Sequence, residues 1–243
     1  MMVKGQYYYD SRTPRYAVLF AAPLLFAYEL LAWLLSNPVT PGVRNGADVM
    51  LKAPFVHLAG YRGVIAFDCL LAITGVWLVA RDWRRHPGPL RLPVFPLMLA
   101  ESVGLALIVG VVLRYATAAL LHYFVLSRPA GLDMPTQLMV SLGAGIYEEL
   151  LFRVILVGGL SLLAKRVFGW TPRSASVFAV LLSALLFSSF HYIGAYGDTM
   201  RVSSFVFRLL AGLVFSSLYV VRGFGITAWT HALYDVVVTV GGG

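Results

Sequence analysis

The stretch from Ser141 to Arg153, Ser-Leu-Gly-Ala-Gly-Ile-Tyr-Glu-Glu-Leu-Leu-Phe-Arg, places two adjacent glutamates and an arginine inside an otherwise apolar run. Continued to Leu163, the run is long enough to cross a bilayer, which takes about 20 predominantly apolar residues. A charged side chain at the centre of a membrane helix costs roughly 2.5–3.5 kcal/mol on insertion scales. Three such groups so close together require partners from neighbouring helices. We therefore interpret Glu148, Glu149 and Arg153 as the centre of a buried polar site.

The composition is that of a membrane protein. Of the 243 residues, 59% are hydrophobic and 12% are charged, and the mean hydropathy is +0.79. Soluble domains carry about 25% charged residues. We therefore predict an all-α integral membrane protein, a multi-pass helical bundle that forms a single transmembrane domain over residues 1–243. The lone cysteine, Cys69, excludes an intramolecular disulfide and a zinc site built on cysteines.

Apolar runs of membrane-spanning length divide the chain. Seven spans is our prediction, within a range of six to eight that depends on the N-terminal stretch and on the loop over residues 37–61. We expect Gly143 and Gly145 to bend the fourth span or to delay its start. The predicted spans cover residues 15–36, 62–80, 94–113, 137–163, 174–193, 203–221 and 225–240.

The net charge of +8 reflects the loops between spans. The basic residues form no stripe with interleaved aromatic residues, so we expect no nucleic-acid partner. Positive charge beside membrane segments is typical of the cytoplasmic side. Most lysines and arginines outside the spans share the side of the N-terminus, including those of the proline-rich linker over residues 81–96. We therefore expect a cell-membrane protein with a cytoplasmic N-terminus.

Several charged residues lie in or near other spans. We interpret Glu29, Asp68, Glu101 and Arg208 as members of structural ion pairs, because an unpaired charge at membrane depth is costly. Glu101 and Asp68 are the two candidates for the partner of Arg208.

Helical spacing indicates which residues of the first motif share a helix face. Glu149 and Arg153 are four residues apart and share one helix face, which favours an ion pair. Glu148 points about 100° away on a helix of 3.6 residues per turn, so it is left free for another task.

Two further motifs place ionisable residues on later spans. Phe187-Ser-Ser-Phe-His191 lies near the end of the fifth run, and His231-Ala-Leu-Tyr-Asp235 lies on the last run. Intramembrane Glu, His and Asp side chains mark ion paths, proton relays or catalytic sites. A buried glutamate can act as a general base, and a histidine beside it can help to hold the water that attacks a peptide carbonyl. With straight spans, His191 falls nearer the outer surface than Glu148, so one site requires the fifth helix to tilt, to start later or to break near Ser188.

These residues resemble the CAAX prenyl endopeptidase and bacteriocin-processing family of intramembrane proteases, also called the CPBP or Abi family. The resemblance covers residues 137–240, under half of the chain, and this region would be the catalytic core. Any one motif is weak, and three in order on membrane runs are specific. The family signature is Glu-Glu-x-x-x-Arg, then Phe-x-x-x-His, then His-x-x-x-Asn or Asp, and it reads here as Glu148-Glu149-Leu-Leu-Phe-Arg153, Phe187 to His191, and His231 to Asp235.

The resemblance implies a role for each residue. Glu148 matches the glutamate that activates water, with His191 assisting. His231 and Asp235 match the pair that stabilises the oxyanion. The supporting positions are those of Glu149, Arg153 and Phe187. The family is described as glutamate-type, which implies no cofactor, and its substrates are membrane-associated proteins or peptides, with roles in C-terminal processing and protein sorting.

Asp235 departs from the prenyl-protein proteases, which have Asn at this position. An ionised Asp only accepts hydrogen bonds, whereas Asn also donates. Unless it is protonated, Asp235 cannot serve an oxyanion directly and would orient His231 instead. Asp is also a better metal ligand, so a divalent-metal protease that uses His191, His231 and carboxylates, with zinc as one such metal, stays an alternative.

Two alternatives from other classes remain. A proton-coupled transporter also uses chains of Glu, His and Asp, but transporters commonly contain internal repeats, and the sequence has none. The other alternative is a membrane scaffold without catalytic activity. The favoured prediction is an intramembrane endopeptidase that acts on a membrane-associated protein or peptide within the lipid bilayer.

Overall fold

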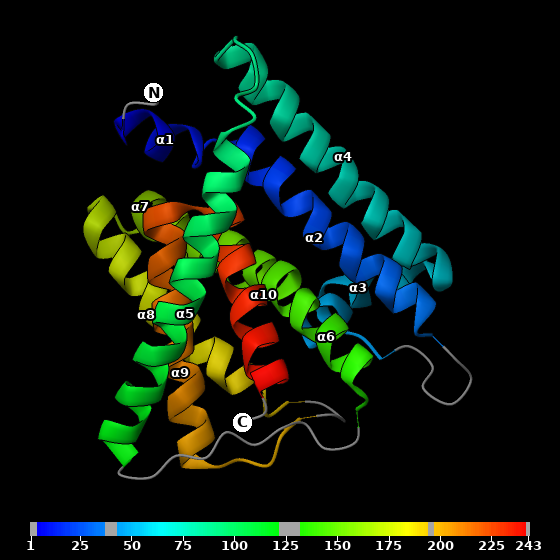
Figure 1. The fold of residues 1–243 in the computed structure, drawn as a ribbon, viewed down its shortest axis with the longest axis vertical. Coiled ribbons are helices and arrows are strands. Elements are labelled where there is room, and N and C mark those ends of the chain that lie inside the picture. Colours follow the sequence, from blue (N-terminus) through cyan, green and yellow to red (C-terminus); the bar gives the residue numbers. More distant parts are fainter. Residues whose placement is uncertain (1–3, 37–42, 122–131, 194–196, 242–243) are drawn as a thin grey trace.

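The structure, a computed structural model, describes residues 4–36, 43–121, 132–193 and 197–241. All regular elements in these ranges are helical, as Figure 1 shows. In chain order they are α1 (Lys4–Asp10), α2 (Pro14–Leu34), α3 (Gly46–Ala59), α4 (Tyr61–Arg85), α5 (Val94–Leu121), α6 (Met134–Gly143), η1 (Ala144–Glu148), η2 (Leu150–Val157), α7 (Gly158–Val167), α8 (Pro172–Phe190), α9 (Val202–Arg222) and α10 (Phe224–Gly241).

Helix starts follow local capping chemistry. The side chains of Asn45, Asp133 and Thr171 each accept a hydrogen bond from a backbone N–H in the first turn of α3, α6 and α8. Such caps satisfy donors that the helix itself leaves unpaired. A proline at the first turn of α6 and of α8 adds a residue whose missing N–H costs nothing there.

The all-helical membrane architecture predicted from the sequence is confirmed. Five helices, α2, α4, α5, α8 and α9, are long and apolar enough to cross a membrane. The other two predicted spans correspond to the run from α6 to α7 and to α10, which are helical but are not among these five. The count of seven spans therefore stays a prediction. Many large apolar side chains are exposed, including those of Leu70, Ile73 and Val76 on α4, as expected for a lipid-facing surface.

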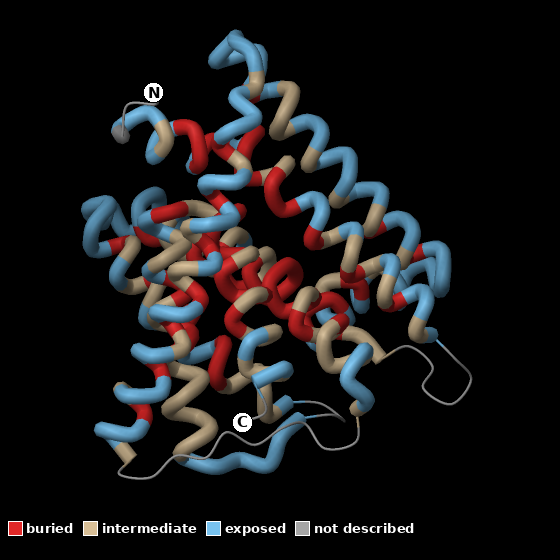
Figure 2. The backbone as a smooth tube through the Cα atoms, in the orientation of Figure 1, coloured by how far each residue is buried: buried red, intermediate tan, exposed pale blue. Residues whose placement is uncertain are grey.

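Helix α10 lies at the centre of the bundle. It contacts α2, α5, α6, α9, η1 and η2, and the buried residues in Figure 2 gather around it. Small residues permit this close packing. A Cβ atom on Gly145 would lie 2.5 Å from the carbonyl oxygen of Ala228 and 2.6 Å from the Cβ of Ala232. Gly145 therefore allows η1 to touch α10 directly.

The fourth helical run changes its winding where the charged motif begins. Residues Ala144–Glu148 and Leu150–Val157 form π-helical turns, whereas α6 before them and α7 after them are α-helical. π-Helical turns are rare and often occur at functional sites. The run changes its winding in the region where a bend or a late start was expected, and the helix is not interrupted at Gly143 or Gly145.

Candidate active site

Glu149 and Arg153 form the ion pair that their spacing predicts. The Nε atom of Arg153 lies 3.1 Å from Oε2 of Glu149, and both side chains are fully buried. The guanidinium also lies over the ring of Phe187, with its central carbon 4.6 Å from the ring centroid. Burial of a charge requires such compensation, since an isolated ion in an apolar interior is costly. Arg153 is therefore held by one carboxylate and by an aromatic face.

Glu149 has a second partner that the sequence does not indicate. Its Oε1 atom lies 2.6 Å from Nδ1 of His231 on α10. On the other side of the ring, Nε2 of His231 lies 3.5 Å from Oδ2 of Asp235, one turn further along α10. The ring of Phe215 stacks on the imidazole, with centroids 4.2 Å apart and planes 19° apart. The orientation of His231 is thus set from three sides.

His191 directly follows α8 as its C-cap residue. Its Nδ1 atom lies 2.8 Å from the carbonyl oxygen of Phe187, and the two rings meet edge to face. Because a carbonyl oxygen only accepts hydrogen bonds, Nδ1 carries the proton, and Nε2 of a neutral ring is left as an acceptor. Helix α8 is continuous through Ser188, so the break considered from the sequence is absent. Contacts of Phe152 with Phe187 and Phe190 join this end of α8 to η2.

Glu148 lies between these groups. It is 7% exposed, and it interacts electrostatically with His191, His231 and Arg153. Its carboxylate accepts a hydrogen bond of 2.9 Å from Nδ2 of Asn45. The structure therefore brings the three sequence motifs into one cluster, made by η1, η2, the end of α8, and α10.

Sequence reasoning missed Asn45 and the polar network behind it. Asn45 belongs to the loop expected over residues 37–61, of which Gly46–Ala59 is in fact a helix, α3. The hydroxyl of Tyr28 donates to Asp48, and the hydroxyl of Tyr147 donates to Glu29. Arg44 and Lys52 neutralise the same carboxylates. In the sequence, Asn45 can be recognised only as a candidate N-cap residue before a short helical stretch. That pattern does not indicate a contact with Glu148.

The partners considered for Arg208 were wrong. Glu101 pairs with Arg222 at 2.6 Å, and Asp68 pairs with Lys52 at 3.0 Å. Arg208 pairs instead with Asp198, which lies outside the predicted spans. Partner choice depends on how the helices rotate about their axes, and span positions alone do not give that rotation. Each of the four charged residues nevertheless has an ion-pair partner, as expected. Glu29 pairs with Arg44 and Lys52.

Within the described ranges, no group of three or more His, Cys, Asp or Glu residues is arranged to hold a metal ion. His231 faces Glu149 and Asp235. His191 faces the backbone of Phe187 with one nitrogen.

Comparison with known proteins shows which family the later part of the chain resembles. Residues 130–237 match the model of the Rce1-like family, type II CAAX prenyl endopeptidase. No curated protein and no solved structure gives a match. The matched region includes all three motifs and most of the core expected over residues 137–240. Residues 130–237, somewhat less than half of the chain, are therefore similar to the type II CAAX prenyl endopeptidases, a family of membrane proteases.

Proposed function

We propose that the protein is an intramembrane endopeptidase of glutamate type. Its substrate is a membrane-associated protein or peptide, and its reaction is the hydrolysis of a peptide bond in C-terminal processing or protein sorting. The observation that carries the proposal is that Glu148 is a buried carboxylate that interacts electrostatically with His191 and His231. All three residues lie in the part of the chain that matches a family of proteases.

The chemistry assigns Glu148 as the general base. Its carboxylate takes a proton from water, and the hydroxide attacks the carbonyl carbon of the scissile bond. His191 assists by accepting a hydrogen bond from that water at Nε2, since its Nδ1 proton is committed to Phe187. When the tetrahedral intermediate collapses, the proton held by Glu148 passes to the leaving amine. The C–N bond breaks, and the carboxylate is regenerated.

His231 is the proposed source of oxyanion stabilisation. Its ring lies between two carboxylates, 2.6 Å from Glu149 and 3.5 Å from Asp235. With a proton on each nitrogen, the ring can donate to both carboxylates and carries a positive charge. A fixed positive ring beside the reacting carbonyl stabilises the negative charge that develops on its oxygen. Asp235 then acts by orienting His231 and not by donating to the oxyanion, and Glu149, Arg153 and Phe187 support the arrangement.

We further propose a cell-membrane location with the N-terminus in the cytoplasm. The concentration of arginines at the end of α4 and in the linker to α5 supports this orientation. The lipid bilayer and the peptide substrate are the proposed partners, with no nucleic acid and no cofactor.

The test is a cleavage assay with purified protein in detergent on a quenched peptide library. Glu148→Gln and His191→Ala should each abolish cleavage, and a chelator should leave the wild-type rate unchanged. Loss of activity with the chelator and its return with added zinc would favour the metal-dependent alternative. A wild type that cleaves nothing, but conducts protons in liposomes, would favour the transporter.

A further inference from the structure

A residue outside the three motifs contacts the proposed base. Nδ2 of Asn45 donates to Oε1 of Glu148 at 2.9 Å, although 103 positions separate the two residues in sequence. Asn45 is 3% exposed, so water does not compete freely for this bond. Because Glu148 interacts only electrostatically with His191 and His231, Asn45 is the side chain that fixes the direction of its carboxylate through a hydrogen bond.

The orientation of the Asn45 amide is determined by its other contacts. Its Oδ1 atom accepts a hydrogen bond of 2.9 Å from the backbone N–H of Ala47, which caps α3. Its backbone N–H donates to the hydroxyl of Tyr28 at 3.1 Å, and that hydroxyl donates to Asp48. An amide with its oxygen bound to an N–H must turn its NH₂ group the other way. The NH₂ group therefore faces Glu148.

A glycine makes room for this contact. A Cβ atom on Gly143 would lie 2.8 Å from the Cβ of Asn45 and 2.5 Å from the ring of Tyr28. These distances are too short for two carbon atoms, so any larger residue would push Asn45 and Tyr28 away from the end of α6. The close approach at Gly143 and the hydrogen bond at Glu148 thus hold the start of α3 against the helical run that carries the proposed base.

We propose that Asn45 is a positioning residue for proteolysis, which holds the Glu148 carboxylate toward the water and His191. This inference rests on the proposed function. It adds to the reaction centre a residue from α3, outside the region that matches the family model.

Asn45→Ser should remove the hydrogen bond to Glu148 and keep the one from the backbone N–H of Ala47. Serine is as good an N-cap residue as asparagine, so α3 keeps its cap, but the shorter hydroxyl does not reach Glu148. We expect kcat to fall about 10- to 100-fold, as for a lost hydrogen bond to a charged group, with KM within about twofold. The melting temperature should stay near that of the wild type. A wild-type kcat, or a melting temperature that falls in step with kcat, would overturn the inference.

A swap of donor and acceptor tests the contact without an activity assay. Asn45→Asp alone places two carboxylates together in a buried site and should lower the melting temperature. Combined with Glu148→Gln, the same change restores a donor–acceptor pair in reverse, and the melting temperature should recover toward the wild-type value. Simple addition of the two single shifts would show that the residues do not interact and would overturn the inference.

Different results would contradict the proposed function and the positioning role of Asn45. If Glu148→Gln cleaves at the wild-type rate, the proposed function is wrong, and the swap alone decides the Asn45 contact. If Glu148→Gln is inactive while Asn45→Ser keeps the full kcat, the proposed function stands and only the positioning role of Asn45 is wrong.

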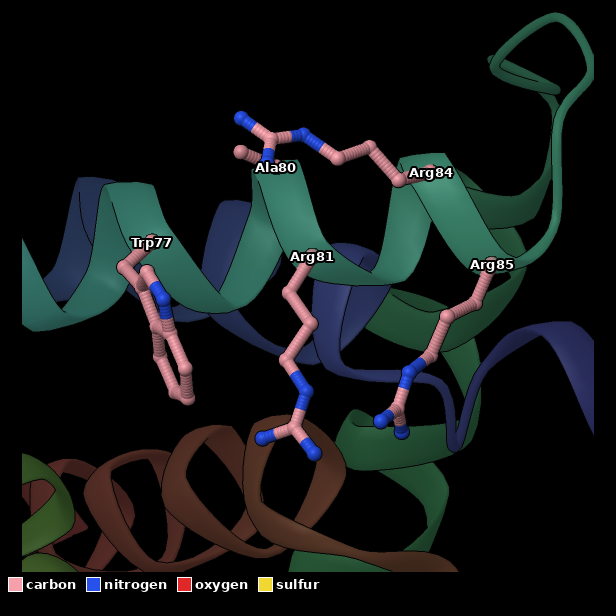
Figure 3. Close-up of a pocket in the computed structure, with 5 residues that line it drawn as sticks. All are labelled: Trp77, Ala80, Arg81, Arg84 and Arg85. Carbon is pink, nitrogen blue, oxygen red and sulfur yellow. The ribbon is translucent and has the colours of Figure 1, made fainter.

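A separate observation points to a second site, at the end of α4. An open surface cavity of about 320 Å³ is lined by residues of α4 alone, all exposed except Ala80, namely Trp77, Ala80, Arg81, Arg84 and Arg85. Figure 3 shows Trp77, Arg81 and Arg85 on one side of the helix, while Arg84 runs back over Ala80. The Arg81 guanidinium lies 4.9 Å from the centroid of the Trp77 ring.

The positive charge of this cavity is not neutralised by the described part of the protein. The neighbouring carboxylate of Asp82 is taken by Arg15 and His86. Asp10 is taken by Arg91. In the described ranges no ion pair joins a carboxylate to Arg81, Arg84 or Arg85. The guanidinium groups of Arg81 and Arg85, which lie on one side of the helix without a protein counter-ion, favour a phosphate, to which arginine can donate two parallel hydrogen bonds.

We propose that this cavity binds the phosphate of an anionic phospholipid headgroup. Its place supports a lipid source, because the apolar part of α4 ends where the arginines begin, and Trp77 is a residue type that prefers the membrane interface. Clusters of arginines at the end of a membrane helix attract acidic headgroups.

The test uses the full chain in nanodiscs of phosphatidylcholine with a minor share of phosphatidylglycerol. Native mass spectrometry counts the phosphatidylglycerol molecules that stay bound. Arg81→Gln with Arg85→Gln should weaken retention about 30-fold, at roughly tenfold per 1.4 kcal/mol and about 1 kcal/mol per arginine. Arg62→Gln with Arg173→Gln removes the same charge elsewhere and should change nothing.

Three results would overturn the headgroup site. Equal retention by the wild type and the Arg81/Arg85 variant would show that the cavity does not bind the lipid. Equal loss in the Arg62/Arg173 control would reduce the effect to net charge. If inorganic phosphate at millimolar concentration displaces the lipid completely and raises the melting temperature as much as the lipid does, the cavity is a site for free phosphate.

Discussion

Nδ1 of His231 lies 2.6 Å from Oε1 of Glu149, and this contact joins the charged motif of the fourth helical run to the central helix α10. The other oxygen of Glu149 faces Arg153 at 3.1 Å. One carboxylate thus serves an arginine and a histidine, and both residues are buried. The second glutamate of the motif is therefore a structural bridge, while the first one, Glu148, accepts a hydrogen bond from Asn45 and interacts electrostatically with His191 and His231.

The bridge predicts a different outcome for the two glutamates. Glu149→Gln removes the charge that compensates Arg153, which is fully buried, and should destabilise the fold by about 3–5 kcal/mol. Glu148→Gln keeps an acceptor for Asn45 and should cost at most about 1 kcal/mol. Thermal unfolding in detergent measures both values. Equal losses of stability in the two variants would contradict the division of roles.

Asp235→Asn tests the departure from the family pattern. Asp235 is expected to act only through His231, whose Nε2 is 3.5 Å from its carboxylate. Asparagine can keep a hydrogen bond to that nitrogen, so kcat/KM should stay within about tenfold of the wild type. Asp235→Leu leaves Nε2 without a partner and should reduce kcat/KM further, by about another tenfold or more. If Asp235→Asn is as inactive as Asp235→Leu, the ionised carboxylate itself is required.

Gly145→Ala should disturb the site through packing alone. The added methyl group would lie 2.5 Å from the backbone oxygen of Ala228, which has no room to move within α10. We expect a loss of about 1–3 kcal/mol and a decrease in activity, because His231 moves with α10. Gly104→Ala on α5 is the matched control, since a methyl group there meets nothing within 4 Å. Its stability should be equal to that of the wild type or slightly higher, as expected for Gly→Ala in a helix. A stable, active Gly145→Ala would show that η1 and α10 are further apart.

The sequence was sufficient for those features that depend on local pattern. Apolar run length predicted the helices, and the four-residue spacing predicted the Glu149–Arg153 pair. It was not sufficient for contacts between distant segments. The link from Glu149 to His231 and the link from Asn45 to Glu148 depend on helix rotation and on close approach at Gly143 and Gly145. The π-helical winding of η1 and η2 also has no periodic signature in an apolar run.

In the proposed reaction, Glu148 is the base that activates water. The most direct measurement is kcat for purified Glu148→Gln and wild type on one cleaved peptide, with the melting temperature of each protein measured in the same detergent. We expect kcat to fall at least about 100-fold, the scale of general-base catalysis, while the melting temperature is unchanged. A folded Glu148→Gln that cleaves the peptide at a rate close to that of the wild type would contradict it.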